Sequence, residues 1–531
     1  MSSSIADEIE PLIAGLLPIR LDVLQAEQHF SRELDHVHLS HLESARNLIH
    51  YLSLRGHDLR DLQYDLGRLG LSSLGRLESH TLATLDAVLD VLHRLAGKQW
   101  SGRALEETFN DFDRGADLLE RNTDESLGEA PDDRKVRIMV AMPSEAASDP
   151  AIIRDFLQRG MDIMRVNCAH DGPEEWRRMV EYLRVAERES GKSCRIVFDL
   201  AGPKLRTGYV VQGTRLRLLR GSDVLCQDEV GALPQVERSL SLSVGDTLML
   251  TPAEILGKPT VHNEEEVVYQ PAQIGCSLAA VFTDARPGER IFFDDGKIAG
   301  IIRSVHNDGE SSHLEIRITH AANGTAKLRA EKGINLPDTR LNISALTPKD
   351  REDLELASEH ADLVSLSFVR RPEDVAELIQ ELDRLGAAQT GIILKIENRP
   401  AVEALPQILL TAMQRTRIAV MVARGDLGVE IGFERMAEIQ EEILWLCEAA
   451  HVPVIWATQV LESLAKRGLP SRAEVTDAAM SGRAEGVMLN KGPHILLALD
   501  FLCDVLARMK GHQTKKSALM RKLSVAEMAL K

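Results

Sequence analysis

The spacing of apolar residues along the chain changes near residue 130. Before it, leucines recur at helical spacing in stretches such as LESARNLIHYLSLRGHDLRDLQYDLGRLG, which predicts a nearly all-helical segment over 1–130. After it, short apolar runs alternate with amphipathic stretches, which is typical of strands followed by helices. The two regions therefore differ in fold class.

The second region predicts a barrel. Its apolar runs mark eight strands, at 136–142, 163–169, 194–200, 363–369, 392–396, 418–422, 452–458 and 486–490. Eight parallel strands with intervening helices are what a closed (β/α)8 TIM barrel of the α/β class requires. The alternative is an open doubly wound sheet, which is disfavoured because polar residues end nearly every run rather than only those at a switch point.

A segment with another pattern interrupts the predicted barrel. Over 209–328, short alternating runs such as RLRLL and HLEIRITH are separated by Gly, Asp and Pro turns, which predicts a small antiparallel β domain placed as a lid. The barrel then has two parts, 131–208 and 329–510. Its last helix is expected at 494–509, and a basic tail, 511–531, follows.

Charged residues end two neighbouring predicted strands. Lys395 lies within the run GIILKI and Glu397 follows it, while Asp426 follows the run IAVMV through a tight turn at Gly425. Consecutive parallel strands present such residues at the same edge of a sheet. Charged residues after a strand are usually solvated loop residues. Here, Lys395 inside an apolar run needs a buried partner, so we expect a divalent-cation site beside a cation that faces a phosphoryl group.

Composition narrows the class of protein. The 531 residues are 44% hydrophobic and carry a formal charge of -18, which disfavours nonspecific binding to nucleic acid. The N-terminal sequence lacks the pattern of an export signal, and no apolar run is long enough to cross a bilayer, so no membrane association is expected. Six scattered cysteines without a CxxC pair fit reduced thiols. Together these features predict a cytoplasmic protein.

Several long strings resemble one family. MRVNCAHDG, FDLAGPKLRTG, FDDGKI, EKGINLPD, LSFVRRPEDV, LKIENRPAVEALPQIL, VMVARGDLGVEI and WATQVLESL occur in the order found in pyruvate kinases. The resemblance covers about 134–510, the family's A and B domains, and leaves the helical segment unexplained. The sequence ends where the family's C-terminal effector domain would begin. The resemblance implies transfer of the phosphoryl group of phosphoenolpyruvate to ADP, giving pyruvate and ATP.

The resemblance also implies roles for individual residues. Glu397 and Asp426 would hold Mg2+ or Mn2+, and the catalytic side chains would be those of Lys395, Arg165 and Thr458. Further contacts to the substrate are implied for Ser367 and for the turn formed by Ala423, Arg424 and Gly425. Nucleotide contacts are implied for Asn167, His170, Arg206 and Lys332, and Asp295 matches a carboxylate carried by the lid.

One lysine, Lys204, concerns whether the protein requires a monovalent cation. The string GPKLRTG places Lys204 where K+-dependent members of the family carry a glutamate, and Ala169 replaces a serine that would ligate K+. The resemblance therefore implies independence from K+, with Lys204 acting as a surrogate cation near Asn167 and Asp199. The physical reason is that an ammonium group is a compact point charge able to stand in for a monovalent ion.

One departure from the family leaves alternatives open. The eighth predicted strand ends in MLNKGPH where the family has an SGET string, so Asn490 and Lys491 replace groups near the nucleotide and the metal. The alternatives to a kinase acting on phosphoenolpyruvate and ADP are a metal-dependent enzyme on phosphoenolpyruvate or an oxoacid that does not use ADP, and a regulatory pseudoenzyme. Two kinds of partner also stay open, a homo-oligomer formed through the barrel and a protein that binds 1–130.

Overall fold

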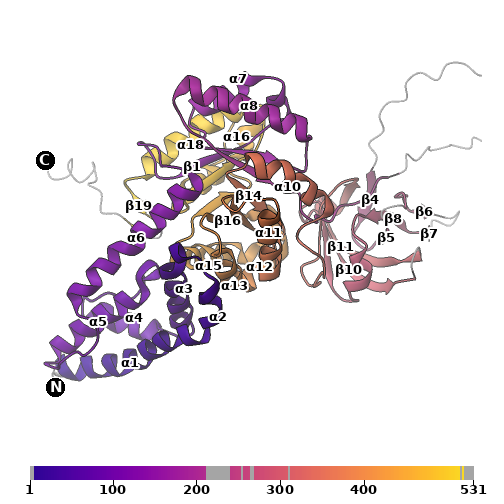
Figure 1. Cartoon of the computed structure of the whole chain (residues 1–531). Helices are drawn as coiled ribbons and strands as arrows, with labels where there is room; N and C mark the ends of the chain where they lie inside the picture. The colour runs from indigo at the N-terminus through magenta and orange to yellow at the C-terminus, as the bar shows by residue number, and fades with distance from the viewer. Residues whose placement is uncertain are drawn as a thin grey trace, which may run out of the picture. The chain divides into compact units, whose positions relative to one another are not determined.

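The computed structural model describes residues 5–210, 239–252, 255–262, 268–308, 311–514 and 517–518. The chain divides into two compact units. The first consists of Met1–Gly202, Ala345–Leu427 and Glu434–Lys531, and the second of Pro203–Ser344 and Gly428–Phe433. Figure 1 follows the chain by colour from its N-terminus to its C-terminus. The predicted bounds of the inserted domain, 209–328, lie inside the second unit.

The first unit contains a closed barrel of eight parallel strands (Figure 1). The order around the barrel is β1, β18, β17, β16, β15, β14, β3, β2. The strands are β1 (Arg137–Ala141), β2 (Ile163–Asn167), β3 (Arg195–Asp199), β14 (Leu363–Leu366), β15 (Gly391–Ile396), β16 (Ile418–Ala423), β17 (Val454–Ala457) and β18 (Gly486–Leu489). All eight predicted strands are present, although their ends differ by up to three residues. The predicted TIM barrel is confirmed, and the open sheet is wrong.

Helices connect the strands of the barrel. Six of them have a proline in the first turn, where the missing N–H would have no helical partner anyway: α7, α8, α10, α11, α12 and α13. The bounds are α7 (Pro150–Gln158), α8 (Pro173–Ser190), α10 (Pro348–His360), α11 (Pro372–Arg384), α12 (Arg399–Glu403), α13 (Leu405–Ala412), α14 (Arg424–Ile431), α15 (Met436–Ala449), α16 (Glu462–Arg467), α17 (Arg472–Met480) and α18 (Ile495–Met509). The last of these confirms the helix expected at 494–509.

Side chains fill the inside of the barrel. Met139, Ile163, Ile393 and Met421, each from a different strand, belong to one fully buried cluster. The same cluster includes Leu127, which comes from the helical segment that precedes the barrel. A barrel of eight strands has room for packed side chains rather than a pore. One leucine of the N-terminal segment is therefore part of the barrel core.

The N-terminal segment is helical, as predicted. Its helices are α1 (Ile5–His29), α2 (Ser31–His36), α3 (Leu42–Arg55), α4 (Arg60–Arg68), α5 (Thr81–Leu95) and α6 (Leu105–Leu127), with short 3-10 turns at Leu39–His41 and Glu78–His80. Residues at helical spacing, such as Ile9, Leu12, Leu16 and Val23 of α1, are buried. The segment has its own apolar core.

Polar contacts join the helical segment to the amino-terminal ends of the strands. The Asn122 side chain donates to the carbonyl of His451 at 2.8 Å, and the Ser126 hydroxyl donates to the carbonyl of Ile418 at 3.2 Å. His41 Nε2 lies 3.0 Å from the carbonyl of Thr416. These bonds satisfy carbonyl groups at the strand starts, where a buried acceptor needs a partner. The sequence did not predict this attachment.

The second unit is a β domain. Its main sheet has six strands in the order β13, β9, β10, β11, β5, β8. The elements are β4 (Ser239–Ser243), β5 (Thr247–Pro252), β6 (Val261–His262), β7 (Val268–Gln270), β8 (Ala272–Cys276), α9 (Ala280–Asp284), β9 (Arg290–Phe293), β10 (Ile298–His306), β11 (His313–Ala321), β12 (Thr325–Arg329) and β13 (Ile334–Asn335). Its strand pairs are antiparallel as predicted, except that β5 and β8 are parallel. The long connection between these two strands lets the chain return in the same direction.

Two parts of the prediction fall partly outside the described residues. The predicted run RLRLL lies in 211–238, and most of the predicted tail, 511–531, lies beyond the short strands β19 (Gln513–Thr514) and β20 (Ser517–Ala518). Among the described residues, no helix is both long enough and apolar enough to span a membrane.

The attachment of the helical segment predicts a pH dependence of stability. His451 lies 2.9 Å from the Ser44 hydroxyl and 2.9 Å from the carbonyl of Ser79, and its burial lowers its pKa to about 4. Between pH 6.5 and 4 the unfolded chain therefore binds more protons at this histidine than the folded protein does. The contribution of His451 to the free energy of unfolding is complete above pH 6.5 and is lost as the pH falls. We expect the loss to reach about 3 kcal/mol of unfolding free energy.

Denaturant titrations at pH 6.5 and 4.5 measure this effect. His451→Asn does not titrate and tolerates the positive φ of 49° at this position, so its stability should depend less on pH than that of the unmodified protein. His29→Asn, which changes an exposed histidine of α1, serves as the control and should keep the original pH dependence. An equal change in the free energy of unfolding between the two pH values for all three proteins would show that His451 does not cause the pH dependence.

Candidate active site at the carboxyl ends of the strands

Most of the residues selected from the sequence lie where the barrel strands end. β2, β3, β14, β15, β16 and β17 are neighbours in this order around the barrel, so the residues at their carboxyl ends lie along one edge. These residues are Arg165, Asn167, Asp199, Ser367, Lys395, Glu397, Ala423, Arg424, Gly425, Asp426 and Thr458. Chemistry in barrels of this kind is carried out at this end.

Lys395 is the centre of a buried polar cluster. Its ammonium group donates to the Ser367 hydroxyl at 2.7 Å, and it lies 3.2 Å from a carboxylate oxygen of Asp199 and 3.2 Å from one of Glu397. Lys395 is 9% exposed, Asp199 1% and Glu397 3%. Charges removed from water this far require partners. Ser367 in turn donates to the carbonyl of Leu200 at 2.6 Å, which fixes the direction of its hydroxyl.

Both members of the Lys395 and Asp199 pair are held in their charged forms. Burial opposes the ammonium form of Lys395, but the carboxylates of Asp199 and Glu397 outweigh it and raise the pKa of Lys395. Burial likewise opposes ionisation of Asp199, yet the cations of Arg165 and Lys395 lower the pKa of that carboxyl group. Arg165 donates from Nε to Asp199 at 2.9 Å and also from Nη2. Two cations therefore converge on one buried carboxylate.

The turn after β14 is conformationally strained at this site. Phe368 has a φ of +55°, which is unusual for a bulky residue, and its N–H donates to Glu397 at 2.7 Å. Asn398 holds the neighbouring backbone, because its side chain donates to the carbonyl of Val369 at 2.9 Å and accepts from the N–H of Ala401 at 3.0 Å. Strain of this kind persists where surrounding contacts enforce it. One carboxylate oxygen of Glu397 is thereby positioned by the main chain.

A second set of contacts fixes the turn after β16. The Gly425 N–H donates to the Thr458 hydroxyl at 2.8 Å, and Thr458 has a φ of +63°. Arg424 donates to the carbonyl of Ala457 at 3.0 Å and to the carbonyl of Thr458. It also forms an ion pair with Asp477. The guanidinium of Arg424 thus braces the ends of β16 and β17. The sequence analysis missed Asp477, and no local pattern marks it, because it comes from α17, more than fifty residues further along the chain.

Two carboxylates near this edge fit a hard divalent cation. Glu397 follows β15, and Asp426 lies in the first turn of α14 after the adjacent β16. Oxygen ligands of this type suit Mg2+, which is often held by one or two carboxylates together with substrate phosphates and water. In the part of the chain that the structure describes, no group of three or more His, Cys, Asp or Glu side chains is placed to hold a metal ion. The remaining ligands would come from the substrate or water.

Two residues selected from the sequence, Asn167 and His170, lie at the end of β2 and in the loop that follows it. The side chain of Asn167 accepts from the N–H of Ala169 at 3.2 Å, and the carbonyl of His170 accepts from Trp176 at 3.1 Å. Asp171, next to His170, has a φ of +62°. These contacts hold the loop after β2. They do not involve the His170 ring, whose contact with a nucleotide stays a prediction.

Four of the selected residues belong to the second unit. Arg206 donates to the carbonyl of Glu331 at 3.0 Å, and the Lys332 ammonium lies 3.1 Å from Asp294. Asp294 was missed by the sequence analysis, although it directly precedes Asp295 in the string FDDG. The two aspartates have φ values of 50° and 56°. The other selected residues of this unit are Lys204 and Asp295.

The barrel region matches one protein family. Residues 133–249 and 230–492 match the family model described as "Pyruvate kinase, barrel domain". A pyruvate kinase of Agrobacterium vitis is 32% identical over 362 residues, which are 67% of this chain and 65% of the relative. A pyruvate kinase of Thermotoga maritima is 30% identical over 361 residues, covering 67% and 66% of the two chains.

A third relative shows how far the similarity extends. The pyruvate kinase of Bacillus licheniformis is 30% identical over 347 residues, which are 65% of this chain but 51% of the relative. The chain thus spans between half and two thirds of the length of these curated relatives. The matched region contains the whole barrel and the inserted β domain. The chain belongs to the pyruvate kinase family.

Proposed function

We propose that this protein transfers the phosphoryl group of phosphoenolpyruvate to ADP and so produces pyruvate and ATP. One observation carries the proposal. The ammonium group of Lys395 is buried among Asp199, Glu397 and Ser367 at the catalytic end of a pyruvate kinase barrel. A fixed positive charge at this place suits a reaction that moves a phosphoryl group between two oxygens.

Positioning and charge supply most of the rate in phosphoryl transfer. Lys395 would stabilise the phosphoryl group in flight, and its raised pKa keeps it charged at neutral pH. Arg165 would hold the phosphate of the substrate, with Asp199 orienting its guanidinium group. Because the cluster is already formed by the protein, little reorganisation would be needed when charge shifts during the reaction.

Divalent metal dependence is typical of the pyruvate kinase family, and we propose Mg2+ or Mn2+ on Glu397 and Asp426 here. A bound divalent cation would supply charge neutralisation to substrate oxygens. The N–H of Phe368 fixes one oxygen of Glu397, which supports a constant ligand direction. Lys395, also in contact with Glu397, would then share this carboxylate with the metal.

We assign the carboxylate of the substrate and the enolate to the turn after β16. The backbone of Ala423, Arg424 and Gly425 leads into α14, and a helix N-terminus favours anions. The Thr458 hydroxyl accepts a hydrogen bond from the N–H of Gly425, so the proton of the hydroxyl is available to a water or an enolate carbon. Thr458 would therefore help to protonate the enolate.

Nucleotide contacts are proposed for the residues that the family resemblance implies. They are Asn167, His170, Arg206 and Lys332, and Asp295 is proposed as a carboxylate of the lid domain. Asn490 and Lys491, which follow β18, stand where the family has an SGET string. They would set the preference among nucleotides.

Lys204 supports the proposal that K+ is not required. An ammonium group supplied by the protein needs no recruitment of an ion, and Ala169 offers no side-chain ligand for one. We therefore propose that Lys204 substitutes for the monovalent cation.

Replacement of Lys395 is the direct test of the proposed activity. Lys395→Met removes the fixed charge, and we expect formation of pyruvate from phosphoenolpyruvate, ADP and Mg2+ to fall at least about 100-fold. The measurement is NADH consumption coupled to lactate dehydrogenase, with ATP assayed separately. Lys98→Met, which changes an exposed lysine paired with Glu10, should keep full activity. Activity of the unmodified protein no higher than that of Lys395→Met would refute the proposal.

Ser367 tests whether the hydrogen bond to Lys395 positions the ammonium group. Ser367→Ala removes that acceptor, and we expect kcat to fall about tenfold, since one hydrogen bond to a charged group is worth roughly 1.5–3 kcal/mol. The KM for phosphoenolpyruvate should change less. Ser358→Ala on the surface of α10 removes a hydroxyl that bonds only to its own helix and is the matched control. Equal kcat for the two variants would exclude the positioning role.

Monovalent cations test the assignment of Lys204. Turnover in Na+ or tetramethylammonium buffer should match turnover in K+ buffer. Lys204→Glu should lower kcat, and K+ should not restore it fully because Ala169 cannot ligate the ion. Initial rates at constant ionic strength give the comparison. Activation of the unmodified protein many-fold by K+ would show that Lys204 does not replace the ion.

A further inference from the structure

A cavity of about 470 Å³ lies at the amino-terminal end of the barrel, the end away from Lys395. Its walls come from the helical segment and from the barrel, both in the first unit. The helical segment contributes the turn Glu78–His80 and one side of α6. The barrel contributes the starts of β1 and β18 and the end of α18. Clefts of a few hundred cubic ångströms are the usual size for small-molecule sites.

One wall of the cavity is apolar. Phe112, Ala116 and Leu119 of α6 share this wall with Leu506 and Met509 of α18. Phe112 has 54% of its surface exposed, although its ring stacks on His80 at a centroid distance of 3.8 Å. Apolar side chains left partly uncovered beside a cavity favour a ligand with an apolar body.

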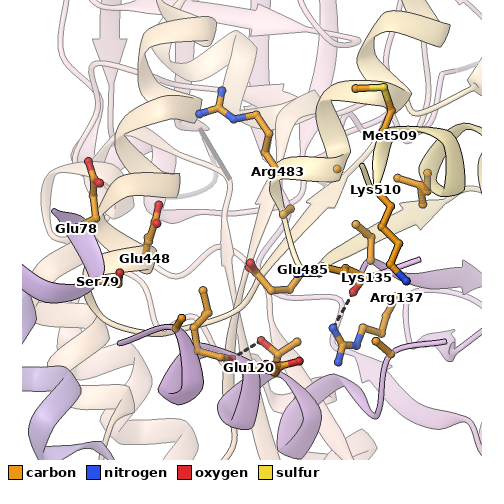
Figure 2. Close-up of a pocket in the computed structure, with 18 of the residues that line it drawn as sticks. Glu78, Ser79, Glu120, Lys135, Arg137, Glu448, Arg483, Glu485, Met509 and Lys510 are labelled. Carbon is orange, nitrogen blue, oxygen red and sulfur yellow. Dashed lines mark hydrogen bonds between the residues drawn. The ribbon is translucent and has the colours of Figure 1, made fainter. Parts of the chain in front are cut away.

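The polar part of the lining offers a place for a charged group of that ligand. Five cations, Arg76, Lys135, Arg137, Arg483 and Lys510, and four glutamates line the cavity. Arg137 is already paired with Asp124 and Arg483 with Glu441, so these two are neutralised by the protein. Figure 2 shows Lys135, Arg137, Lys510 and Met509 on one side of the cavity and Glu78 and Glu448 on the other. A cation of the lining that has no acidic partner would attract an anionic group to its side of the cavity.

The cations of the lining differ in how many hydrogen bonds and ion pairs they already make within the protein. Arg137 donates to the carbonyls of Gly128 and Lys135, at 2.8 Å in each case, and Arg483 forms an ion pair with Glu441. The Nε of Arg483 is nevertheless buried and finds no acceptor among the described residues. Lys135 is exposed, and within the described ranges it makes no ion pair. Lys135 is thus the cation best placed to accept a new anionic partner.

We propose that this cavity is a binding site for a small amphipathic anion. Its apolar body would lie against Phe112, Leu119 and Met509, and its carboxylate, sulfonate or phosphate group would face Lys135. Since the walls belong to the helical segment and to the barrel, the bound molecule would contact both. A ligand that binds the folded protein in this way stabilises it by mass action.

The dye 8-anilinonaphthalene-1-sulfonate is a suitable probe, because it combines an aromatic body with one sulfonate. The folded full-length protein should bind it with one-to-one stoichiometry, with a gain in fluorescence and a rise in the thermal unfolding midpoint. N-phenyl-1-naphthylamine has the same rings without the sulfonate and reports the apolar contribution alone. Absence of native-state binding at micromolar to millimolar dye would overturn the proposal.

Two variants test where the dye binds, and they separate the contribution of the Lys135 charge from that of the cavity's shape. Ala116→Trp fills the cavity from the exposed surface of α6 and should weaken binding of both dyes at least tenfold. Lys135→Glu should weaken the sulfonate about fivefold or more and leave the neutral dye unchanged. Arg32→Glu reverses an exposed charge of the same helical segment outside the lining and should change neither.

Circular dichroism confirms that each variant is folded before binding is measured. Binding that survives Ala116→Trp would place the dye elsewhere and overturn the proposal. Equal loss of both dyes in Lys135→Glu would refute the preference for an anion. Either result is independent of phosphoryl transfer, because Ala116 and Lys135 lie at the amino-terminal end of the barrel and outside the Lys395 cluster.

Discussion

The buried ammonium group of Lys395 is the constraint on which the carboxyl end of this barrel depends. A lysine at 9% exposure is stable in its charged form only if other groups replace its water, and here they come from β3 and from the residues that follow β14 and β15. β3 is distant in sequence from β14 and β15, and the three strands are adjacent in the closed barrel. The closure of the barrel and the charge of Lys395 therefore support one another, and loss of either carboxylate would leave the buried ammonium group with one carboxylate partner in place of two.

The two ends of the barrel perform different tasks. The carboxyl end holds charged groups and strained residues such as Phe368 and Thr458, whose positive φ values are unfavourable in themselves. The amino end is covered by the helical segment, which places Leu127 in the barrel core and satisfies carbonyls at the strand starts. The contacts that join the helical segment to the barrel thus lie at the end away from the proposed chemistry. The cavity proposed as a binding site lies at this same end.

Much of the fold could be predicted from local sequence. Apolar runs of strand length, each followed by an amphipathic helix, identified all eight barrel strands, and leucine spacing identified the helical segment. Lys395 could be selected because a lysine inside an apolar run is unusual, and Glu397 because it directly follows that run. The parallel pairing of β5 and β8 could not be predicted, since pairing direction depends on where a long connection returns.

The sequence by itself determined the fold class, the family and the residue types at the strand ends. Only the tertiary structure decided which of these residues meet: that Asp199 lies between Arg165 and Lys395, that Asp477 braces Arg424, and that Leu127 enters the barrel. Local patterns report whether a residue prefers burial and which backbone it favours. Contacts between residues far apart in the chain depend on packing, and packing exists only once the barrel has closed.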